Sequence, residues 1–152
     1  MSAVAIAGKG CDTTQGPGLS AVVALLKGRV RTIEELAESA VFFYRRVGPS
    51  AELRQKHYTE ASLAAAALLE RRFAELPSWN RESINKTLKS VVDETRLKMP
   101  MIAMPLRVMV AGKPDTPSID ATLELIDRDE VRRRIREEVA RSNRPETGAS
   151  AA

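Results

Sequence analysis

Helix start and stop signals recur along this chain and leave little room for other secondary structure. The clearest begins at Thr32, whose hydroxyl can accept from the amide of Glu35 while the Glu35 carboxylate reaches back to the start of the helix. Apolar residues then follow at helical spacing until Gly48 and Pro49: Ile33, Leu36, Ala37, Ala40, Phe43 and Tyr44. This pattern predicts an amphipathic helix.

Similar signals predict further helices on both sides of this one. In chain order they are Pro17 to Gly28, 51–57, Thr59 to Pro77, Asn80 to Val92, 119–126 after Ser118, and Asp127 to Val139. The residues from Leu97 to Gly112 differ, because two prolines interrupt a nearly apolar segment, and the residues 113–117 form a rigid turn.

We therefore predict an all-α fold of seven or eight short helices. They form two helical subdomains, 17–95 and 96–141. Residues 1–16 are expected to be a flexible leader or the remnant of an upstream domain, and residues 142–152 a disordered tail.

Composition supports this prediction and excludes several other classes. Aromatic residues make up only 4% of the chain, which disfavours a β-sandwich, and a net charge of +4 allows a polyanionic partner without requiring one. One cysteine, Cys11, and one histidine, His57, rule out an internal disulfide framework and a structural zinc site. We expect a cytoplasmic protein with no membrane-spanning segment and no secretory leader.

Residues that could perform catalysis have no suitable spacing. Gly8 and Gly10 are too few to form a phosphate-binding loop, and no strand precedes them. His57 shares no helix face with a nucleophile, and Cys11 has no basic pair beside it. The acidic pairs 34–35 and 137–138 fit helix caps and solvated faces better than a glycosidase pair. We predict no catalytic residue and no metal site.

Basic residues gather in two places and are more informative. Lys27, Arg29 and Arg31 follow one helix, while Arg96, Lys98, Arg107 and Lys113 surround the proline-rich segment. Guanidinium groups can stack on unpaired bases and donate to base edges, although arginines at helix ends can also simply complement the helix dipole. Arg107 favours a ligand, because a charge within the apolar segment 104–110 must be paired or directed at a partner.

Two segments resemble a known family. Residues 25–36, with Lys27-Gly28-Arg29 near their centre, resemble the opening helix pair of the α-helix cage in bacterial glutamyl-tRNA synthetases. Residues 104–112 and 116–119 resemble that family's proline-leucine-arginine signature and its threonine-proline turn. Trp79 also lies where the family keeps a tryptophan. The resemblance extends from about residue 16 to 139 and implies the carboxyl-terminal, anticodon-binding region, folded as a cage of helices.

The resemblance also implies roles for single residues. Arg29 matches the arginine that contacts the last anticodon base and helps to reject glutamine tRNA. Arg107, Thr116 and Ile119 match residues that contact the anticodon from the second subdomain. Possible phosphate or backbone contacts are Lys27, Arg31, Arg96, Lys98 and Lys113.

For the whole enzyme, the resemblance implies attachment of glutamate to its tRNA with ATP and Mg²⁺. The expected partners are glutamate tRNA isoacceptors and an upstream catalytic domain, and the expected state is a monomer. This chain alone needs no cofactor, because the family's His-Ile-Gly-His-like and Lys-Met-Ser-Lys-Ser-like signatures are missing. Pro100 and Met101 stand where the family commonly has glycine and lysine, which removes one possible phosphate contact, and Asp127 replaces a usual glycine.

Two alternatives remain at this level. A free-standing helical adaptor or regulatory paralogue would bind a protein partner, or tRNA without aminoacylation, and a protein-binding adaptor should expose an apolar patch of several hundred Å². A small-molecule enzyme is disfavoured, because only an interhelical crevice would support it.

Overall fold

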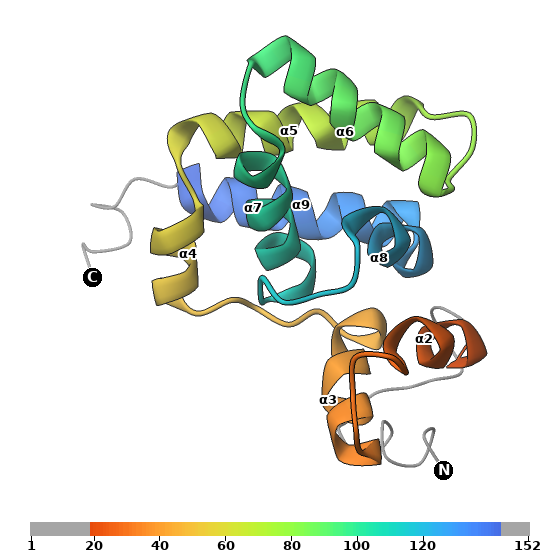
Figure 1. Ribbon diagram of the computed structural model, residues 1–152. Helices are drawn as coiled ribbons and strands as arrows, with labels where there is room; N and C mark the ends of the chain where they lie inside the picture. Colours follow the sequence, from red (N-terminus) through yellow and green to blue (C-terminus); the bar gives the residue numbers. More distant parts are fainter. Residues whose placement is uncertain (1–18, 144–152) are drawn as a thin grey trace.

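The computed structural model describes residues 19–143 and folds this part of the chain into eight α-helices without a strand (Figure 1). The helices are α2 (Leu19–Leu26), α3 (Ile33–Tyr44), α4 (Ala51–His57), α5 (Glu60–Glu75), α6 (Arg81–Thr95), α7 (Met99–Ala111), α8 (Ile119–Ile126) and α9 (Arg128–Asn143). The predicted all-α fold is confirmed.

Polar residues cap several helices as their sequence predicts. Thr59 and Asn80 each accept a hydrogen bond from the amide three residues later and form reciprocal capping boxes with serines. At α3 the amide of Glu35 donates to the Thr32 hydroxyl over 3.0 Å, as expected. The Glu35 carboxylate differs from expectation, because it accepts from the amide of Arg31 rather than from that of Thr32.

The helix α7 forms despite its two prolines and lies at the centre of the fold. Pro100 occupies the first turn, where no backbone donor is needed, while Pro105 lies inside the helix. Eight of the thirteen residues of α7 are buried. Burial on nearly all sides explains why the sequence shows an apolar run here instead of an amphipathic stripe.

The core continues from α2 to α9. Helix α5 packs against α6, α7 and α9, while α6 also packs against α8. Buried residues from Val22 to Ile135 belong to one hydrophobic cluster. Figure 1 shows α2 and α3 below the body formed by α4 to α9, with the extended segment 45–50 leading from α3 to α4. The division into subdomains 17–95 and 96–141 stays a prediction.

A buried arginine joins three of these helices. Arg134 on α9 is 1% exposed and donates to the carbonyl oxygens of Phe42, at 2.7 Å, and Val110, at 2.6 Å. These carbonyls belong to the last turns of α3 and α7, where helices leave acceptors unsatisfied. The Arg134 Nε also donates to Glu130 over 2.8 Å. Arg134 therefore fixes the helix ends that lead to the candidate site.

The predictions for the chain ends fall mostly outside the described residues. These include the leader 1–16 and Cys11. Helix α9 continues to Asn143, so the first two residues of the segment predicted to be a disordered tail are helical. Within residues 19–143, no helix combines the length and apolar character needed to cross a bilayer.

Candidate functional site

The turn between α7 and α8, residues 112–118, brings the predicted site residues together; we call it the recognition turn. It starts at Gly112, whose φ of 75° ends α7 in the left-handed conformation. A Cβ atom at this position would lie 2.5 Å from the carbonyl oxygen of Val47, so the turn sits directly against the segment 45–50.

Arg29 reaches the recognition turn from the loop after α2. Its Nη2 lies 2.6 Å from Oδ1 of Asp115 in an ion pair whose side chains are 41% and 88% exposed. Exposed pairs of this kind contribute only ~0–1 kcal/mol. Asp115 therefore orients the Arg29 side chain at low energetic cost and leaves it able to exchange this partner for a ligand.

Arg107 approaches the same turn from α7. Its Nε donates to Oγ1 of Thr116 over 3.1 Å, and its Nη1 lies 3.3 Å from the sulfur of Met104. The Thr116 hydroxyl in turn donates to the carbonyl oxygen of Pro117 over 2.8 Å. Among the described residues, Arg107 forms no ion pair with a carboxylate. Arg29 and Arg107 thus contact consecutive residues, Asp115 and Thr116, of one turn.

Lys113 adds a third cation to this surface. Its Nζ lies 5.6 Å from the centre of the Phe42 ring, a cation–π distance. Burial lowers the pKa of Lys113; the nearby Arg29 acts in the same direction, while Asp115 and Glu38 oppose it. Three cations, Arg29, Arg107 and Lys113, therefore lie at or beside the recognition turn. The carboxylates of Asp115 and Glu38 lie near Lys113 and partly offset this positive charge.

The remaining predicted residues divide into three groups. Thr116 and Ile119 are only 7% and 8% exposed, so little of either side chain lies at the surface. Lys27 and Arg31 are exposed within two residues of Arg29. Arg96 and Lys98 are exposed at the opposite end of α7, about 20 Å away along a 13-residue helix (Figure 1). The structure does not bring them to the recognition turn.

Sequence reasoning missed a charged cluster centred on Glu138. This carboxylate is fully buried, whereas the pair 137–138 was expected on a solvated face. It accepts from Arg46 over 2.6 Å, from Arg54 over 3.1 Å at each oxygen, and from the Tyr58 hydroxyl over 2.8 Å. Such contacts between distant segments leave no local signal in the sequence.

Catalytic or metal-binding geometry is not evident in the described part of the chain. No group of three or more His, Cys, Asp or Glu side chains within residues 19–143 could hold a metal ion. The chemistry that the recognition turn offers is donation of N–H groups from guanidinium forks, which suits the edges of bases and phosphate oxygens.

Comparisons with known proteins identify the family to which this chain is similar. The family described as anticodon binding domain matches residues 3–139. The chain is 48% identical over 122 residues to a glutamate–tRNA ligase of Cupriavidus taiwanensis, covering 80% of this chain and 26% of that protein. It is 46% identical over 127 residues to a glutamate–tRNA ligase of Thiobacillus denitrificans, covering 84% of this chain and 27% of that protein.

A solved structure shows the same fold. A glutamate tRNA ligase from Elizabethkingia meningosepticum, crystallised in complex with its amino acid, aligns with a TM-score of 0.79 at 17% identity. The alignment covers 91% of this chain and 28% of the other. The chain thus spans about a quarter of the length of the curated relatives. With the family model matching nearly its whole length, the chain belongs to the anticodon binding domain family.

Proposed function

We propose that this chain binds and discriminates the anticodon of glutamate tRNA as part of a glutamate–tRNA ligase. The observation that carries the proposal is the placement of Arg29 and Arg107 on adjacent residues of the recognition turn. Two guanidinium forks from separate helical segments can hold two unstacked loop bases side by side. RNA sequence is recognised mainly on such bases.

Within this proposal, Arg29 and Arg107 donate to base edges, and Lys113 contributes charge from its place over Phe42. Thr116 acts chiefly by accepting from Arg107 and orienting it, since the threonine itself is nearly buried. Lys27 and Arg31 supply phosphate contacts close to Arg29. Arg96 and Lys98 would contact only RNA that extends beyond the loop, because they lie at the far end of α7.

The whole enzyme would attach glutamate to tRNA with ATP and Mg²⁺ supplied at an upstream catalytic domain. We further propose a cytoplasmic monomer. The adaptor alternative gains no support from the surface. Within residues 20–142, the large apolar side chains with substantial exposure are Ile33 and Met101, at the first turns of different helices. They form no patch of the size that a protein-binding face needs.

Binding of a synthetic anticodon stem-loop of glutamate tRNA tests the proposal. We expect Arg29→Ala and Arg107→Ala each to weaken binding about ten- to a hundredfold, because a lost arginine–base contact costs ~1–3 kcal/mol. The loss should shrink when the corresponding base is changed. Arg71→Ala is the charge-matched control, since Arg71 is exposed on α5 and pairs with no carboxylate among the described residues. Equal binding by all three variants would contradict the proposal.

A further inference from the structure

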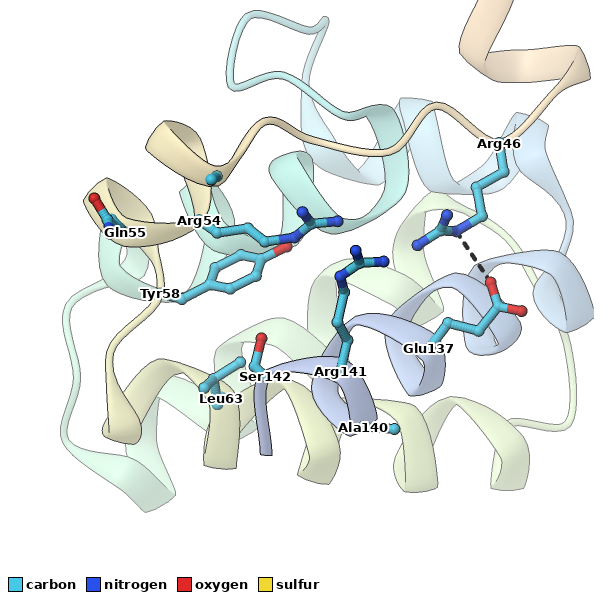
Figure 2. Close-up of a pocket in the computed structure, with 10 residues that line it drawn as sticks. Arg46, Arg54, Gln55, Tyr58, Leu63, Glu137, Ala140, Arg141 and Ser142 are labelled. Carbon is cyan, nitrogen blue, oxygen red and sulfur yellow. Dashed lines mark ion pairs between the residues drawn. The ribbon is translucent and has the colours of Figure 1, made fainter. Parts of the chain in front are cut away.

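A second basic site lies away from the recognition turn, in an open pocket of about 950 Å³. Residues of α4, Tyr58 just after it, the start of α5 and the C-terminal end of α9 line the pocket, and none of them belongs to the recognition turn (Figure 2). Three of the lining residues are arginines: Arg46, Arg54 and Arg141. The proposed function assigns no role to any of them.

Hydrogen bonds to Glu138 fix two of these arginines, Arg46 and Arg54. The buried Glu138 accepts from Nη2 of Arg46 over 2.6 Å and from Nε and Nη2 of Arg54 over 3.1 Å. A guanidinium carries five N–H donors, so both side chains retain further donors after these bonds are made. Arg46 Nε also lies 3.0 Å from Glu137, although without the geometry of a hydrogen bond.

The third arginine has no such partner. The side chain of Arg141 is exposed, and its guanidinium forms no hydrogen bond or ion pair with another residue of 20–142. Figure 2 shows its guanidinium pointing across the pocket toward that of Arg54. Two like charges facing one another repel, and an anion between them would turn this repulsion into attraction. Counting Glu137 and Glu138 against the three arginines leaves the pocket with one excess positive charge.

We propose that this pocket binds a phosphate group between the guanidinium groups of Arg54 and Arg141, with Arg46 as the third donor. Phosphate fits better than carboxylate, because several oxygens can accept from separate forks at the same time. The apolar side chains of Leu63 and Ala140 and the ring of Tyr58 line the pocket beside the arginines and leave room for a sugar attached to the phosphate. The phosphate could belong to an RNA backbone or to a soluble phosphate compound.

Titration of the whole chain with inorganic phosphate at constant ionic strength tests the proposal. We expect saturable NMR shifts of the arginine Nε–H signals and of backbone amides in 51–58 and 137–142. Arg141→Ala should weaken binding about tenfold, because it removes one charge-assisted partner without touching Glu138. Arg136→Ala is the control on the same helix: Arg136 is exposed but lies near Glu70 of α5, outside the pocket, and its loss should leave binding within about twofold of the parent.

Absence of saturation, or equal weakening by Arg141→Ala and Arg136→Ala, would overturn the proposal, because general electrostatics would then explain the binding. The anticodon stem-loop distinguishes the two phosphate sources. If Arg141→Ala also weakens RNA binding and lowers its salt slope by about one, the phosphate is part of the RNA backbone. If Arg141→Ala weakens phosphate binding but leaves RNA binding unchanged, the ligand is a soluble phosphate compound. Failure of Arg29→Ala to affect RNA would leave this phosphate result intact.

Discussion

At the scale of single residues, Glu138 is the most consequential charge in the fold. Its carboxylate is fully buried and accepts hydrogen bonds from Arg46, Arg54 and Tyr58, which belong to the segment 45–58. A buried ion pair adds little stability compared with apolar packing, but removal of one partner leaves the others uncompensated. Glu138 therefore determines whether α4 can stay docked on α9.

Glu138→Gln preserves the shape of the side chain and removes its charge. We expect it to lower the free energy of unfolding by ~3 kcal/mol, because Arg54 then has no counterion among the described residues and Arg46 keeps only the more exposed Glu137. Urea denaturation measures the change. The control is Glu137→Gln, since Glu137 is 45% exposed and its pairs with Arg46 and Arg133 are worth ~0–1 kcal/mol. Equal losses in the two variants would contradict the assignment.

The pH dependence of stability gives the same variant a second test. Burial alone would raise the pKa of Glu138, but the hydrogen bonds from Arg54 and Tyr58 and the charges of Arg54 and Arg46 outweigh burial and lower it. The unfolded chain therefore binds the proton more readily. The stabilisation is present above the unfolded pKa and is lost as pH falls through the lower folded pKa. Glu138→Gln should reduce this acid sensitivity of the free energy of unfolding. The part that comes from Glu130, whose pKa is also lowered, should remain.

The sequence predicts residue roles only where local context carries the signal. Arg107 is conspicuous as a charge in an apolar segment, and the structure places it beside Thr116. Glu138 looks like one half of an exposed acidic pair, because its partners lie 80 to 92 residues away along the chain. Long-range pairing of this kind becomes visible only when the helices are packed.

At the scale of elements, several helix boundaries follow the predicted start and stop signals closely. The predicted helices 51–57 and 119–126 have the observed bounds. Helix α3 ends earlier than the Gly48-Pro49 signal indicates, because Arg45 already adopts extended backbone and begins the segment that supports Gly112. The helix α7 was not evident, since its two prolines hide a helix whose stability comes from burial rather than propensity.

Gly112 offers the sharpest test of how an element ends. Gly112→Ala should lower the free energy of unfolding by at least ~2 kcal/mol, because alanine must adopt a φ of 75° and its Cβ would lie 2.5 Å from the Val47 carbonyl oxygen. It should also weaken stem-loop binding by displacing the recognition turn. The matched control is Gly28→Ala, where nothing lies within 4 Å of the added Cβ. Thermal unfolding of both variants decides, and a similar midpoint for the two would refute the expectation.

At the scale of the whole molecule, the packing across the proposed boundary near residue 95 is extensive. Helix α5 packs on α7 and α9, α6 packs on α8, and one apolar cluster includes Leu88 of α6 and Ile135 of α9. Trp79 contacts both sides of the same boundary. Its Nε1 donates to the carbonyl oxygen of Leu123 in 96–141 over 3.0 Å, and its ring packs edge-on against Phe73 in 17–95. Trp79 fluorescence therefore reports on both proposed subdomains.

A continuous core predicts that the two proposed subdomains unfold together. Urea transitions followed by Trp79 fluorescence and by far-ultraviolet circular dichroism should coincide, because a small domain with one core loses it in a single step. Leu88→Ala and Ile135→Ala lie on either side of the boundary and are both fully buried in the parent chain. Each should cost ~2–5 kcal/mol and shift both transitions equally. If Ile135→Ala moved only part of the helical signal and left the Trp79 transition in place, 17–95 and 96–141 would be independent folding units. In that case only the contacts of Arg29 and Arg107 with the recognition turn would fix the position of these two arginines relative to one another.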